Sequence, residues 1–91
     1  MSHVIRLTEE AQTDLLRLYD FLIEQDPDTT RVAESALDSI TQAFQFLRNF
    51  PYGCRKVMPH NPYLRELIIP FGSTGYVALF EIEPDDLVTI L

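Results

Sequence analysis

The segment YVALFEIE, residues 76–83, decides the fold because its side chains alternate strictly between two faces. One face is apolar or aromatic throughout, at Tyr76, Ala78, Phe80 and Ile82. The other face begins apolar and ends in carboxylates, at Val77, Leu79, Glu81 and Glu83. A period of two residues is typical of a β-strand that turns one face to a core. The segment therefore predicts a strand, and we expect the two carboxylates of its second face to be solvated.

Further strands are predicted on both sides of this segment, over residues 55–58, 63–71 and 87–91. The intervening segments consist of turn-forming residues: PHNP at 59–62, GSTG at 72–75 and EPDD at 83–86. Connections this short join antiparallel neighbours, so we expect three or four strands arranged as a meander.

The first half of the chain predicts one short strand, His3–Leu7, and a helix. Thr8 is the expected N-cap of that helix, and Glu9 and Glu10 follow where acids favour the positive helix end. Apolar side chains then recur every three or four residues, at Ala11, Leu15, Leu18, Tyr19 and Leu22. The helix should span residues 9–24 and stop before Pro27, because the residue before a proline avoids helical angles.

A second helix is predicted from an apolar stripe with a spacing close to seven: Ala33, Ala36, Leu37, Ile40, Ala43, Phe44 and Leu47. The segment NFPYG, residues 49–53, ends it. The tight link Asp26-Pro27-Asp28 forces the two helices into an antiparallel hairpin. We expect one α+β domain over residues 1–91, in the order β-α-α-β-β-β(-β). The hairpin packs on one face of a small, mainly antiparallel sheet and leaves a groove and an open sheet edge.

The charge of the chain favours a protein partner over a nucleic acid. Fourteen acids against seven bases give a net charge of −7, with the acids concentrated in residues 9–38. A protein that holds a phosphate backbone usually carries a basic face, so we expect no sequence-specific nucleic-acid binding. The chain start lacks the pattern of a signal peptide, and apolar runs such as Leu67–Ile69 are too short to span a membrane. The single cysteine, Cys54, fits a small core residue in a reducing cytoplasm.

No pattern predicts a catalytic centre, a metal site or a cofactor. His3 and His60 do not stand at ligand spacing from Cys54 or from a carboxylate pair, and His60 is expected in an exposed turn. The serines form no nucleophile elbow, and the loop 72–75 lacks the lysine of a phosphate-binding loop.

A small basic island remains, formed by Arg48, Arg55, Lys56 and Arg65. If the strands pair across the turn 59–62, Arg55 and Arg65 project from one face and form a contact patch for protein or RNA. In the alternative, Arg65 pairs with Glu66 or with a helix carboxylate, and Arg55 and Lys56 keep a sheet edge soluble.

Five segments together resemble the ParE/RelE superfamily of bacterial toxins, and the ParE branch more closely: LTEEA (7–11), DLLRLYDFL (14–22), NFPYGCR (49–55), YLREL (63–67) and GYVALFEI (75–82). The resemblance covers essentially the whole chain. It implies a cytoplasmic toxin of a type II toxin–antitoxin system, neutralised by a ParD-like antitoxin and directed at DNA gyrase. It also implies an alternative, because RelE-like relatives cut messenger RNA on the ribosome; an inactive remnant that only binds its antitoxin is the third possibility.

The RelE activity rests on several basic residues and usually a C-terminal tyrosine or histidine. Only Arg55, Lys56 and Arg65 match that basic set, and Val77 and Ala78 stand where an arginine often follows the tyrosine, here Tyr76. The resemblance therefore disfavours ribosome-dependent cleavage. It leaves Arg55, Lys56, Arg65 and Tyr76 as candidate partner-binding residues, and replacing Arg55 and Arg65 together is expected to weaken gyrase inhibition.

In many relatives, the strand that corresponds to DDLVTIL (85–91) continues into a short basic segment. We expect that this chain is a shortened form of a slightly longer protein.

Overall fold

The computed structural model describes residues 2–25, 30–71 and 74–91. Its elements follow the predicted order: β1 (Val4–Leu7), α1 (Glu9–Gln25), α2 (Arg31–Asn49), a 3-10 turn η1 (Pro51–Gly53), β2 (Arg55–Met58), β3 (Asn61–Phe71), β4 (Thr74–Glu83) and β5 (Leu87–Ile90). The helix-to-helix link at 26–28 and residues 72–73 of the predicted hairpin loop lie outside the described residues.

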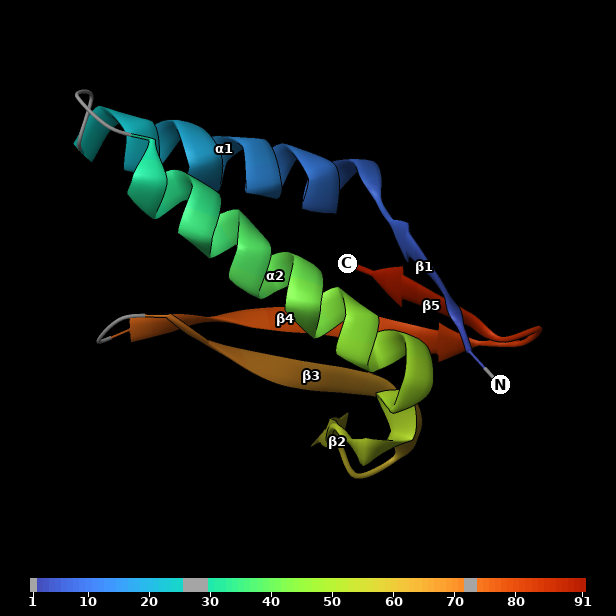
Figure 1. Cartoon of the computed structure of the whole chain (residues 1–91). Coiled ribbons are helices and arrows are strands. Elements are labelled where there is room, and N and C mark those ends of the chain that lie inside the picture. Colours follow the sequence, from blue (N-terminus) through green and yellow to red (C-terminus); the bar gives the residue numbers. More distant parts are fainter. Residues whose placement is uncertain (1, 26–29, 72–73) are drawn as a thin grey trace.

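The α+β prediction is confirmed. Figure 1 shows both helices on the same side of the strands, running in opposite directions and diverging from each other. Thr8 caps α1 as expected, since its Oγ1 atom accepts a hydrogen bond from the Ala11 amide at 3.1 Å.

The described strands form one sheet in the order β1-β5-β4-β3-β2. The strands from β2 to β5 make the expected antiparallel meander. The first strand adds a relationship that the meander did not predict: β1 pairs parallel with β5, with Val4 opposite Leu87 and Leu7 opposite Ile90. The sheet is therefore mixed, and the last strand lies inside it.

The turn before β3 is shorter than predicted. Met58 already pairs with Asn61, so the strand begins two residues earlier and only Pro59 and His60 remain in the turn. The Asn61 side chain accepts hydrogen bonds from the Tyr63 and Leu64 amides, at 3.1 and 3.3 Å. His60 is exposed, as expected.

The core lies between the helices and the helix-facing side of the sheet. Its central residues are Leu47 of α2, Phe80 of β4 and Val88 of β5, which are completely buried. The alternation of β4 is confirmed, because Ala78, Phe80 and Ile82 are buried while Val77 and Leu79 are exposed.

Candidate functional site

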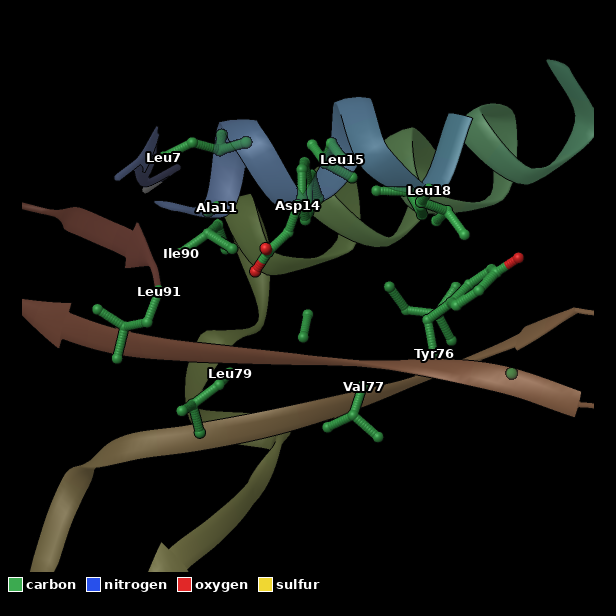
Figure 2. Close-up of a pocket in the computed structure, with 15 residues that line it drawn as sticks. Leu7, Ala11, Asp14, Leu15, Leu18, Tyr76, Val77, Leu79, Ile90 and Leu91 are labelled. Carbon is green, nitrogen blue, oxygen red and sulfur yellow. The ribbon is translucent and has the colours of Figure 1, made fainter. Parts of the chain in front are cut away.

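A hollow among the described residues lies between α1 and β4. It is a cavity of about 450 Å³ whose lining is mainly apolar, and Figure 2 shows side chains of both helices and of the sheet around it. Leu15 and Leu18 of α1 lie on the helix side, and Tyr76 stands on the opposite strand. Figure 1 explains the space: α2 descends onto the strands toward its C-terminal end, whereas α1 stays farther from β4.

The backbone of β4 borders this cavity and is only half covered. β5 pairs with β4 over Phe80–Glu83, and the Leu91 amide donates to the Leu79 carbonyl oxygen at 2.9 Å. Within the described strands, residues 74–78 of β4 pair with β3 alone. From Leu79 toward its N-terminal end, β4 therefore has a free edge that can pair with another strand. This edge lies next to the apolar cavity.

Tyr76 belongs to the cavity and lies apart from the basic residues. Its ring stacks on Phe71, with centroids 5.8 Å apart. Tyr76 pairs with Ile69 and Phe80 pairs with Arg65, so the tyrosine and the arginine are four positions apart along β3. At the rise of a strand, that separation is about 13 Å.

Arg65 is held by main-chain carbonyls. Its Nη1 atom donates to the carbonyl oxygens of Tyr52 and Cys54, each at 2.8 Å, and its Nε atom donates to that of Pro62 at 2.7 Å. The guanidinium also lies over the Tyr52 ring, 5.4 Å from its centroid. These bonds connect η1 and the residue before β2 to β3. Arg65 bonds to carbonyl oxygens, so the expected pairing of Arg65 with a carboxylate is wrong.

The register also separates the two arginines. Arg55 pairs with Glu66 and Lys56 pairs with Arg65, so Arg55 and Arg65 lie on opposite faces of the sheet. The expectation of a shared face is wrong. Arg55 forms an ion pair with Glu66, with Nε and Oε1 3.2 Å apart, and it lies with Lys56 on an edge strand.

Cys54 and His3 have structural roles. Cys54 is buried, and burial raises the pKa of its thiol, which the nearby Arg65 charge partly opposes. His3 joins the end of α2 to the β4–β5 turn through the Arg48 carbonyl and Asp86. Across the described ranges, no three histidine, cysteine or carboxylate side chains gather where they could hold a metal ion.

Comparison with known proteins decides the family. The model of the ParE toxin of type II toxin–antitoxin systems, parDE, matches residues 5–91. The chain belongs to the ParE toxin family. Two relatives from Caulobacter vibrioides carry RelE names. Toxin RelE1 is 33% identical over 86 residues, which cover 90% of this chain and 82% of the relative. Toxin RelE3 is 32% identical over 85 residues, which cover 92% and 85%. The resemblance to the ParE/RelE superfamily is thereby confirmed.

In this ParE-family toxin, sequence reasoning expected a groove and an open sheet edge, but it did not locate the cavity or the half-covered part of β4. The apolar stripes of both helices were visible, but their spacing does not reveal that α1 stays away from β4. The exposed apolar side chains of β4, Val77 and Leu79, were visible in the alternation. Within the described part of the chain, no helix is long and apolar enough to cross a membrane.

Proposed function

We propose that this ParE-family toxin inhibits DNA gyrase and that its antitoxin neutralises it by filling the cavity under α1. A type II toxin has a protein antitoxin as its partner, and the chain belongs to such a family. The target and the docking place are the proposed parts.

The hydrogen bonds of Arg65 are the main support for proposing a protein target. A toxin that cuts RNA needs free cations to hold phosphates and to stabilise the charge that develops on them. Here the guanidinium of Arg65 donates three of its five N–H groups to carbonyl oxygens, and Arg55 is paired with Glu66. The net charge of −7 opposes RNA binding further. A target that is itself a protein fits these observations better.

The cavity and the edge of β4 support the place of the antitoxin. An amphipathic helix can lay its apolar face against Leu15, Leu18 and Tyr76, and an extended segment can pair with residues 74–78. A segment that orders on binding would gain both main-chain hydrogen bonds and apolar contacts. At a concentration about a thousand times its Kd, such a partner would stabilise the toxin by about 4 kcal/mol.

Ribosome-dependent cleavage of messenger RNA is the second candidate. The two relatives named RelE toxins favour it. Arg48 and Lys56 are the exposed cations of the island whose side chains form no ion pair among the described residues, so this alternative depends on them.

Two assays on the purified toxin decide between the targets. Inhibition of gyrase supercoiling, relieved by the antitoxin, is the expected result. Cut messages in a translation reaction, with gyrase unaffected, would replace the first candidate by the second. Activity in neither assay would mark the chain as a remnant that only binds its antitoxin.

Docking in the cavity is tested with Leu18→Lys, and Leu16→Lys is the control. Leu18 lines the cavity, whereas Leu16 lies outside it on the same helix with 66% of its surface exposed. We expect Leu18→Lys to weaken antitoxin binding about tenfold or more, because it places a charge in an apolar contact. Calorimetric titration gives the affinities, and equal affinities for the two variants would exclude the cavity.

A further inference from the structure

The face of the sheet that carries no helix has an exposed apolar patch at the β3–β4 hairpin. Ile68 and Val77 pair across the two strands and expose 61% and 63% of their surfaces. Leu79 on β4 exposes 37%, and Pro70 on β3 is also exposed. Val77 and Leu79 also border the cavity, but Figure 2 shows the side chain of Val77 pointing away from the helices. We call Ile68, Pro70, Val77 and Leu79 the open-face patch.

Carboxylates surround the open-face patch. Glu66 pairs with Leu79, and Glu81 follows two residues later on β4, on the same face. Among the described strand residues, the register places two cations on this face, Arg55 and Arg6. Each is already bound to a carboxylate: Arg55 to Glu66 at 3.2 Å, and Arg6 to Glu83 at 3.1 Å.

This arrangement suits a protein and opposes a nucleic acid. A nucleic-acid surface needs free cations along the phosphate path, often with aromatic rings for stacking. The open-face patch has aliphatic side chains at its centre and charges at its margin, which is the anatomy of a protein–protein interface.

Charge also argues against a second copy of this chain as the occupant. Two copies would bring together margins on which Glu81 has no ion pair among the described residues, and each chain carries a net charge of −7. Like charges across an interface cost free energy, whereas lysines or arginines on a partner would match this margin.

We propose that the open-face patch docks the target protein of this toxin through an apolar segment flanked by lysine or arginine. The inference rests on the proposed function, because it requires that the target be a protein. It assigns the target to the face opposite the cavity and the antitoxin to the cavity.

Val77→Lys tests the proposal, because it puts a cation at the centre of the patch. Leu16→Lys is the matched control, since its exposure is nearly the same and it lies on α1. We expect Val77→Lys to raise the toxin concentration for half-inhibition of gyrase supercoiling about tenfold or more. Glu81→Lys should raise it several-fold by repelling the basic margin of the target. The control should remain within about twofold of the native toxin.

Antitoxin affinity and melting temperature complete the experiment. The melting temperature should be nearly unchanged in Val77→Lys, which separates lost docking from lost folding. The antitoxin affinity should be nearly unchanged in Glu81→Lys, because Glu81 lies outside the cavity lining and outside residues 74–78. Native-like inhibition by Val77→Lys would overturn the proposal, and so would a loss of antitoxin binding in Glu81→Lys. Sedimentation that shows a native dimer broken by Val77→Lys would also overturn it and make a second copy the occupant.

A native toxin that leaves gyrase untouched refutes the proposed target, but the open-face patch can still be tested. The same variants are then compared in the message-cleavage assay. Because lysine favours contact with RNA, unchanged or increased cleavage by Val77→Lys would overturn protein docking. A fall of about tenfold, with folding intact, would support docking on a protein of that target. A native toxin that is inactive in both assays would overturn both proposals.

Discussion

The guanidinium of Arg65 covers the ring of Tyr52 at 5.4 Å and donates to the Tyr52 carbonyl oxygen at 2.8 Å. Two more carbonyl oxygens, those of Cys54 and Pro62, complete its set of acceptors. The segment between α2 and β2 contains only the short turn η1, and the hydrogen bonds of this side chain connect it to β3.

Replacing Arg65 is therefore expected to affect stability before function. Arg65→Ala should lower the free energy of unfolding by about 2–3 kcal/mol, because hydrogen bonds from a charged donor are lost together. Arg65→Lys should lower it by about 1–2 kcal/mol, since an ammonium group cannot reproduce the planar fork of donors. Urea unfolding measures both.

Arg55→Ala is the control for this series. Its ion pair with Glu66 involves an arginine side chain that is 77% exposed, so the expected loss is below about 1 kcal/mol. Equal losses for Arg55→Ala and Arg65→Ala would contradict the stabilising role of the hydrogen bonds that Arg65 donates. The difference also means that a double replacement of Arg55 and Arg65 cannot report on gyrase contact unless stability is measured alongside.

Gly75→Ala is expected to destabilise the β3–β4 hairpin. A Cβ atom at this position would lie 2.7 Å from the Ile69 carbonyl oxygen, which is backbone and cannot move away without disturbing the ladder. The expected cost is about 1–3 kcal/mol. Gly53→Ala provides the comparison, because its Cβ would meet only an ordinary contact at 3.8 Å. Thermal melting that gives the same midpoint for both variants would argue against the close approach.

The stability of the β4–β5 turn should depend on how easily the residue at position 85 adopts a positive φ angle. Its φ angle is 65°, in the left-handed region that costs most residues free energy. We expect Asp85→Gly to remain within about 0.5 kcal/mol of the native chain or to exceed it, and Asp85→Ala to fall about 1 kcal/mol below the glycine variant. Denaturant midpoints decide the order, and an alanine variant as stable as the glycine variant would refute it.

The Cys54 thiol should resist modification while the chain is folded. Burial raises its pKa, so the reactive thiolate is rare at neutral pH. Iodoacetamide should therefore label the native chain much more slowly than the chain unfolded in urea, as followed by mass spectrometry. Rapid labelling of the native chain at about pH 7.5, well below the ordinary thiol pKa, would show that the thiol is not buried.

The same raised pKa gives stability a pH dependence of defined sign. The folded state keeps the thiol proton more tightly than the unfolded state, so the contribution of this group is complete below the ordinary thiol pKa of about 8.5. It is lost as the pH rises through the higher folded value. As the pH rises above about 8.5, the free energy of unfolding of the native chain should fall by more than that of Cys54→Ala. Parallel losses in the two proteins would contradict this effect.

The sequence by itself determined the order of helices and strands and the family of this protein. The alternation of residues 76–83, the apolar stripe from Ala33 to Leu47 and the cap at Thr8 are local patterns, and each depends on neighbours within a few residues. Local geometry controls helix and strand periods, so these predictions agree with the structure almost to the residue.

Only the tertiary structure decided which distant residues meet. The parallel pairing of β1 with β5, the opposite faces of Arg55 and Arg65, and the carbonyl acceptors of Arg65 all depend on strand register and on contacts far apart in the chain. Likewise, the divergence of the helices produces the cavity, and the register of β5 pairs it with only half of β4. A shift of one residue in register exchanges the two faces of a strand, and no local pattern in the basic island selects that register.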